Sequence, residues 1–207
     1  MTQISLVRHG LVYNPGQIYY GRLPGFGLAE LGREQAEAAG RALAVEPVAA
    51  VYHSPMQRAA ETAAIVHSLC SADAPMAACE LLNEVHSSFD GLSVEEMERR
   101  GWDFYRDKVP GFEQPEHILA RILQFFDEAR AQYPNQHVVG VSHADPIAFA
   151  VMWACDLHPA ADHRKHLSEC GVIDNYPSPA SISTFTFAEG DERKLISFRY
   201  VAPFNKA

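Results

Sequence analysis

The amino-acid sequence predicts a three-layer α/β/α sandwich with a mostly parallel central sheet. Short apolar runs typical of buried strands alternate with longer segments whose apolar residues recur at helical spacing. The chain of 207 residues, with 47% hydrophobic and 21% charged residues, has the composition of an ordinary globular protein. This length is enough for one domain with a sizeable core, and we expect residues 1–207 to form a single domain.

Five segments have the pattern of strands. Residues 4–7, 48–52 and 137–142 are short apolar runs of the kind found in buried strands. Residues 181–187 alternate in polarity, and a short polar turn separates them from the run at 195–201. The last two segments therefore predict a hairpin.

Four helices are predicted between these strands. They span residues 30–43, 55–69, 116–132 and 145–154. Ser54 followed by Pro55 predicts an N-cap and a first helical residue. Asp145 followed by Pro146 repeats this start, so we expect Asp145 to cap its helix. The segment 83–114 is less regular and is predicted to be an insertion over one end of the sheet, above the active site.

The charge and the cysteines exclude several classes of partner. A net charge of −9 argues against non-specific nucleic-acid binding, so an anionic substrate must meet a local basic pocket. No apolar run is long enough for a membrane span, and the N-terminus lacks a signal-peptide pattern. No cysteine pair has the spacing of a zinc or redox motif. We therefore expect a cytoplasmic protein with reduced thiols, bound to neither nucleic acid nor membrane.

Charged and imidazole side chains stand where three of the predicted strands end. Arg8 and His9 follow the first strand, Arg58 begins the helix after the second, and His143 follows the third. Ligands of α/β sheets bind at the carboxyl ends of the strands, close to helix N-termini that favour phosphate. A single histidine there is more often structural, and a single arginine is often a surface ion pair. Four such residues together predict an oxyanion site.

With these residues in place, the sequence resembles the histidine phosphatase superfamily, in the branch that includes the cofactor-dependent phosphoglycerate mutases. The similarity runs in order from residue 4 to about residue 150, with a weaker similarity at 178–181. The matching motifs are LVRHG at 6–10 with Asn14, Gly21-Arg22, LGREQA at 31–36, SPMQRAAETA at 54–63, LNEV at 82–85 and VSH at 141–143. Each motif is short, but the ordered set is specific.

The resemblance implies a role for each matching residue. His9 would take the phosphoryl group, and Glu84 would donate a proton to the leaving oxygen. Arg8, Arg58 and His143 would hold the phosphoryl oxygens. The residues expected to line the substrate pocket are Gly10, Asn14, Tyr20, Gly21 and Ala144. This scheme requires no metal and no cofactor.

The physical chemistry of phosphoryl transfer agrees with these roles. His9 must be neutral to attack phosphorus, and Arg8 and Arg58 are expected to lower its pKa. The arginines would neutralise charge on the phosphoryl oxygens, and covalent transfer to nitrogen splits the reaction into two steps. Glu84 must be protonated to act as an acid, which requires burial or a nearby phosphate to raise its pKa.

Two positions depart from the family pattern. Serines follow Glu84 where a glycine is common, and that stretch is one residue shorter, so His86 and Asp145 remain alternative proton carriers. Asp145 replaces the small residue often found after the second histidine.

His163 and His166 have a spacing that suits a metal pair, although a solvated polar helix explains them better.

Three functions fit these residues. A metal-independent phosphatase is favoured; a mutase would need a closing lid, and the segment 83–114 is shorter than the insertion associated with mutases. A non-catalytic phosphate-binding module is the third, although neither the nucleophile nor an arginine is lost.

A small phosphorylated metabolite is the expected substrate, with a phosphoprotein as the alternative. Trp102, Phe104 and their aromatic and basic neighbours in this segment either cover the pocket or pack against the sheet.

Overall fold

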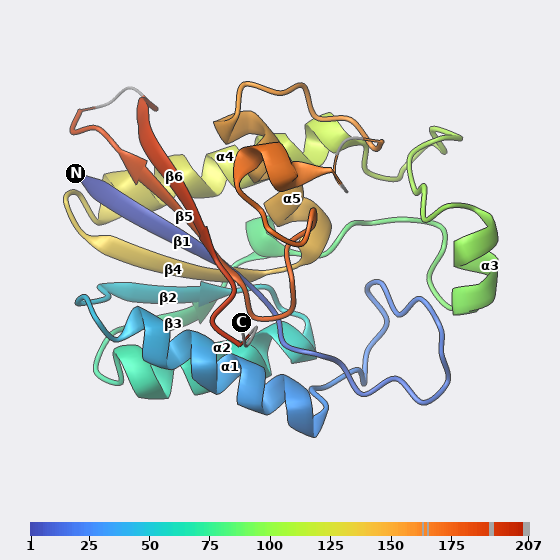
Figure 1. Cartoon of the computed structure of the whole chain (residues 1–207), viewed down its shortest axis with the longest axis horizontal. Coiled ribbons are helices and arrows are strands. Elements are labelled where there is room, and N and C mark those ends of the chain that lie inside the picture. Colours follow the sequence, from blue (N-terminus) through green and yellow to red (C-terminus); the bar gives the residue numbers. More distant parts are fainter. Residues whose placement is uncertain (163, 165, 191–192, 205–207) are drawn as a thin grey trace.

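A six-stranded sheet forms the centre of the computed structural model, which describes residues 1–162, 164, 166–190 and 193–204 (Figure 1). The strands lie in the order β3-β2-β4-β1-β5-β6. They are β1 (Thr2–Arg8), β2 (Ala50–His53), β3 (Met76–Ala78), β4 (His137–Ser142), β5 (Ile182–Phe187) and β6 (Leu195–Val201). The first four are parallel, and β5 and β6 form the predicted antiparallel hairpin. The predicted mostly parallel central sheet is confirmed.

Helices cover both faces of this sheet, as the sandwich prediction requires. They are α1 (Glu30–Leu43), α2 (Gln57–Cys70), α3 (Val94–Arg99), α4 (Pro115–Gln132) and α5 (Ala144–Ala154). Figure 1 shows α1 and α2 on one face, α4 and α5 on the other, and α3 away from the sheet. Short 3₁₀ turns lie at Glu80–Leu82 and Leu167–Cys170. None of the helices in the described ranges is long and apolar enough to cross a bilayer.

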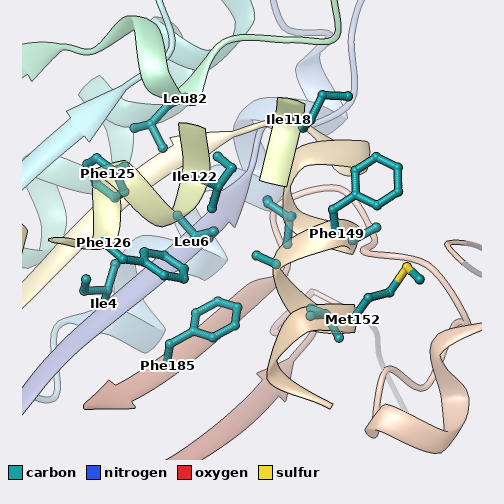
Figure 2. Close-up of a cluster of buried hydrophobic side chains, with 14 of the residues drawn as sticks. Ile4, Leu6, Leu82, Ile118, Ile122, Phe125, Phe126, Phe149, Met152 and Phe185 are labelled. Atoms are coloured by element: carbon teal, nitrogen blue, oxygen red, sulfur yellow. The ribbon is translucent and has the colours of Figure 1, made fainter. Parts of the chain in front are cut away.

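The larger core lies between the sheet and the pair α4 and α5. Phe126 of α4 contacts Phe185 of β5, with ring centroids 4.9 Å apart, and Ile4 of β1 lies beside them (Figure 2). Ile122 and Phe149 are also fully buried in this cluster. Burying one side chain of this size contributes roughly 1.5–3 kcal/mol, so this layer anchors the central strands.

The second core lies on the opposite face and is built of smaller residues. α1 presents Ala36, Ala39 and Gly40, and α2 presents Ala63 and Val66. Small side chains allow the two helices to lie close to each other and to the sheet. This packing fixes the start of α2, where Arg58 lies.

Two predicted helix caps are wrong. α2 begins at Gln57 with Met56 as its N-cap, and the hydroxyl of Ser54 both accepts from the N–H of Met56 at 3.3 Å and lies 2.8 Å from Nε2 of His143. α5 begins at Ala144 with His143 as its N-cap. Asp145 therefore lies inside the first turn, and its carboxylate faces other partners.

Strand pairing brings the predicted site residues to one edge of the sheet. Arg8 at the end of β1 pairs in register with Ser142 at the end of β4, and the N–H of His9 donates to the Ser142 carbonyl at 3.0 Å. The N–H of Ser54, just after β2, donates to the Val141 carbonyl at 2.9 Å. The carboxyl ends of three parallel strands therefore meet, as the sequence predicts.

Candidate active site

His9 has one ring nitrogen fixed and the other available. Its Nδ1 lies 2.8 Å from the carbonyl oxygen of Gly10, which can only accept, so Nδ1 carries the proton. Nε2 therefore keeps its lone pair, and it accepts a hydrogen bond from Nε of Arg58 at 3.3 Å. The His9 side chain is thus oriented as a neutral imidazole whose Nε2 carries the lone pair.

Arg58 joins the residues of the site to one another. Its guanidinium is 1% exposed, and its Nη2 donates to the Gly21 carbonyl at 2.8 Å and to Nδ1 of His143 at 3.1 Å. The same nitrogen lies 3.4 Å from a carboxylate oxygen of Glu84. The guanidinium carbon lies 4.7 Å from the centroid of the Tyr20 ring, a distance typical of cation–π contact. A buried cation thus contacts every proposed reacting group.

His143 is completely buried beside His9. Their ring centroids are 5.1 Å apart, and Nε2 of His143 lies 2.8 Å from Oγ of Ser54. Because Ser54 Oγ donates to Asn83 Oδ1 at 3.3 Å, it accepts from His143, and Nδ1 of His143 is left to accept from Arg58. Ser54 therefore sets the tautomer of His143, a role that the cap prediction missed.

The pKa values of the site favour neutral imidazoles and an ionised carboxylate. Burial, followed by the charges of Arg58, His143 and Arg8, holds the pKa of His9 well below its ordinary value, which confirms the predicted direction. Burial also lowers the pKa of His143 to about 4, although Glu84 partly opposes this. Burial raises the pKa of Glu84, but His143 and Arg58 outweigh it and bring it below the usual range.

Glu84 is held in place through its backbone. Its carbonyl oxygen accepts from Arg22 at 2.9 and 2.6 Å and from Arg121 at 3.4 Å. Glu113 binds both arginines, at 3.0 and 2.7 Å, and its carboxylate also accepts from the N–H of His86. Although the residues after Glu84 depart from the family pattern, this network places its carboxylate beside Arg58.

Two further residues predicted to line the pocket, Gly10 and Asn14, have polar groups bound within the protein. The N–H of Gly10 donates to Thr62 Oγ1 at 3.1 Å, and a Cβ at Gly10 would lie 2.2 Å from the Gly32 carbonyl oxygen. Gly10 is therefore required for close packing against α1, and its N–H is already bound. The side chain of Asn14 is also engaged, donating to the Ile18 carbonyl at 2.8 Å.

Neighbouring groups restrict Gly21 and orient Arg8. Gly21 has φ +39°, and a Cβ there would lie 1.8 Å from Asp90 Oδ1, so only glycine fits. Its carbonyl orients Arg58. Nη1 of Arg8 donates to the Pro177 carbonyl at 2.6 Å, whereas its buried Nε has no hydrogen-bond partner among the described residues. Arg8 therefore retains a donor for a ligand.

A pocket of about 340 Å³ opens onto these residues. The predicted residues that line it are Arg8, His9, Asn14, Tyr20, Glu84 and Ala144. Arg58 and His143 lie behind this lining and reach it through His9 and Glu84. A pocket of this size suits a small molecule.

The segment 83–114 forms much of the pocket wall. Trp102 and Phe104 line it, while Tyr105 is buried and packs against α5. The side chain of His86 is exposed, stacks on Phe112 with centroids 4.9 Å apart and is absent from the lining in the described residues. His163, one half of the metal pair weighed above, lies outside the described residues.

Asp145 is the largest departure from the sequence prediction. Its carboxylate accepts from Tyr105 Oη at 2.7 Å, from Nε of Arg164 at 3.0 Å and from the Tyr176 hydroxyl. Asp145, Arg164 and Tyr176 all line the pocket. Sequence reasoning missed the roles of Arg164 and Tyr176, because no motif links residues so far apart along the chain.

His9, Glu84 and His143 also form a cluster whose ligand atoms lie within 4.8 Å of one another, a spacing that could hold a metal ion. Arg58 contacts all three, at 3.3, 3.4 and 3.1 Å. The guanidinium thus supplies positive charge at the place where a cation would bind. The arrangement suits an oxyanion better than a metal ion.

Comparison with known proteins identifies the family. Residues 4–186 match the family model described as "Histidine phosphatase superfamily (branch 1)". The chain belongs to the histidine phosphatase superfamily. The resemblance stated from the sequence is therefore confirmed.

Several individual proteins are similar to this chain. The uncharacterized protein Rv0525 of Mycobacterium tuberculosis is 38% identical over 156 residues, covering 70% of this chain and 75% of that protein. Phosphoserine phosphatase 1 of Hydrogenobacter thermophilus is 30% identical over 156 residues, covering 71% and 73%. The solved structure of YhfR from Bacillus stearothermophilus has a TM-score of 0.77 at 22% identity, covering 94% of both chains. This last similarity shows the shared phosphoglycerate mutase-like fold.

Proposed function

We propose that this protein is a phosphatase that hydrolyses a small phosphorylated metabolite through a phosphohistidine on His9, without a metal ion. The observation that carries the proposal is the state of His9, a neutral imidazole whose Nε2 lone pair faces Arg58. The similarity to a phosphoserine phosphatase supports hydrolysis of a metabolite. The four free cysteines fit a cytoplasmic location.

In the first step, Nε2 of His9 attacks phosphorus and the bond from phosphorus to the ester oxygen breaks. The leaving oxygen takes a proton from Glu84, while Arg8 and Arg58 neutralise the charge on the other phosphoryl oxygens. In the second step, Glu84 removes a proton from water, the resulting oxygen attacks phosphorus, and the P–N bond breaks. Free phosphate leaves and His9 is restored.

Arg58 links substrate binding to the activation of His9 and Glu84. The hydrogen bond from Arg58 to His9 Nε2 must break when a phosphoryl oxygen binds the guanidinium. This frees the lone pair for attack. A bound phosphate dianion also offsets the charge of Arg58 at Glu84, which raises the pKa of that carboxyl and lets it hold a proton.

The phosphoenzyme tests this proposal directly. The purified protein is incubated with a phosphomonoester, quenched in alkali, which preserves phosphohistidine, and digested for mass spectrometry. We expect a phosphoryl group on the peptide that contains His9, together with free phosphate and no loss of rate with a chelator. Interconversion of monophosphoglycerates without free phosphate would show a mutase, and tight phosphate binding without phosphoenzyme would show a binding module.

Replacing Glu84 by glutamine tests the proton donor. The leaving group of an alkyl phosphate is a strongly basic alkoxide, which needs the proton. We therefore expect the kcat/KM of Glu84→Gln for alkyl phosphates to fall by about 10²–10³-fold. p-Nitrophenyl phosphate has a good leaving group and should lose less than about tenfold in kcat/KM. Equal losses on both substrates would argue that Glu84 is not the acid. The variants Asp145→Asn and His86→Ala, assayed on the same pair, test the two alternative carriers.

A further inference from the structure

One side of the pocket is apolar and aromatic. Tyr19, Trp102 and Phe104 line it together, with the Tyr19 ring centroid 4.8 Å from that of Phe104 and 6.4 Å from that of Trp102. Ile18 and Val94 extend the same lining. We call Tyr19, Trp102 and Phe104 the aromatic wall. Such a surface favours an apolar or ring-shaped group in the substrate.

The cation beside this wall is already neutralised. Nε of Arg164 donates to Asp145 Oδ1 at 3.0 Å, and both side chains are almost fully buried, with 3% and 4% exposure. The remaining guanidinium nitrogens donate to the carbonyls of Ala161 and Trp102. Its central carbon lies 5.7 Å from the ring centroid of Phe104. Arg164 is therefore committed to the protein and carries no uncompensated charge for a ligand.

The charges differ between the two sides of the pocket. The pKa of Tyr19 lies well above its usual value because of burial, reinforced by the carboxylates of Glu84 and Asp145. Burial also raises the pKa of Tyr20, but the nearby cations Arg58 and Arg8 oppose it. The two sides of the pocket therefore differ, because nearby carboxylates add to the effect of burial at Tyr19, whereas nearby cations oppose it at Tyr20.

A bound phosphate uses the positive charge that is available. Arg8 and Arg164 are the only arginines or lysines of the pocket lining among the residues that the structure describes, and Arg58 lies directly behind it. The charges of Arg8 and Arg58 match those of a phosphate dianion. The charge of Arg164 is neutralised by Asp145. A second anionic group on the substrate would meet a carboxylate and aromatic rings without a free cation, and such a contact is unfavourable.

We infer that the substrate is a phosphomonoester whose alcohol part carries no negative charge, and that Asp145 makes the pocket discriminate against a second anion. This inference rests on the proposed phosphatase function. It separates the protein from a phosphoserine phosphatase, since phosphoserine carries a carboxylate beside its phosphate. A ring in the alcohol part would stack on the aromatic wall.

Two matched substrate pairs test the inference on the unmodified protein. Glycerol 3-phosphate is compared with 3-phosphoglycerate, and phosphoethanolamine with phosphoserine, because each pair differs by a carboxylate. We expect kcat/KM to be about tenfold or more higher for the member without the carboxylate in both pairs. Equal or higher values for the carboxylates would overturn the inference and leave the phosphatase function standing. Absence of hydrolysis of every phosphomonoester, p-nitrophenyl phosphate included, would instead remove the proposed function.

The variant Asp145→Asn tests the residue responsible. It keeps the size of the side chain but leaves the charge of Arg164 uncompensated, so we expect the preference within each pair to fall by about tenfold. Asp127→Asn is the matched control, because Asp127 pairs with Arg193 outside the pocket lining. Its preference should equal that of the unmodified protein. An unchanged preference in folded Asp145→Asn would contradict the role of Asp145, and the substrate pairs remain decisive if this variant does not fold.

Discussion

Replacing His9 by alanine is expected to abolish turnover, lowering kcat by on the order of 10⁴-fold or more. The reason is that the neighbouring imidazole cannot replace it. Both nitrogens of His143 are engaged, Nε2 with Ser54 at 2.8 Å and Nδ1 with Arg58 at 3.1 Å. His143 is also fully buried behind the pocket lining. Without Nε2 of His9, no phosphoenzyme can form.

The measurement combines rate, covalent trapping and binding. His9→Ala should show no phosphoryl group after an alkaline quench, yet it should still bind inorganic phosphate in calorimetry, because Arg8 and Arg58 remain. His158→Ala is the matched control, since the His158 side chain is exposed and lies outside the lining of this pocket. It should keep the kcat of the unmodified protein. Hydrolysis by His9→Ala above about one hundredth of the normal kcat would contradict nucleophilic catalysis by His9.

The parts of the site that follow strands could be predicted from the sequence. Arg8, His9 and His143 stand directly after apolar runs that become β1 and β4, so parallel pairing alone brings them to one edge. Arg58 follows β2 within one turn of helix and reaches the same edge. The depressed pKa of His9 follows first from its burial at this edge and then from this convergence of cations.

Contacts between distant loops could not be predicted in the same way. Arg164 and Tyr176 reach Asp145 from a segment without a periodic pattern, so their roles depend on tertiary packing. Ser54 has the residue type of an N-cap, but its hydroxyl also contacts the buried His143, which no local pattern indicates, and the helix begins three residues later at Gln57. β3 was also missed, since its three residues are exposed and show no alternation. Local patterns do not report such tertiary contacts.

Replacing Arg58 by methionine is the change expected to have the next largest effect, lowering kcat/KM by about 10³-fold. Methionine has a similar length but no charge, so it removes the donor to the phosphoryl oxygens and the contact that aligns His9. Arg58→Lys keeps a point charge without the planar fork and should recover only part of the loss. Arg193→Met is the matched control, because Arg193 pairs with Asp127 outside the pocket lining.

The pH profile distinguishes a local effect of this change from misfolding. His9 acts in its neutral form, so activity is lost as the pH falls through its pKa, and the low pKa of His9 places this loss below the ordinary histidine range. Burial is the largest cause of that low pKa, and the charge of Arg58 is the next. Removing Arg58 should therefore raise the pKa of His9 and move the acid limb of kcat/KM to higher pH, whereas Arg193→Met should leave it in place. A large loss of activity with an unmoved acid limb would show that Arg58 binds phosphate without controlling the protonation of His9.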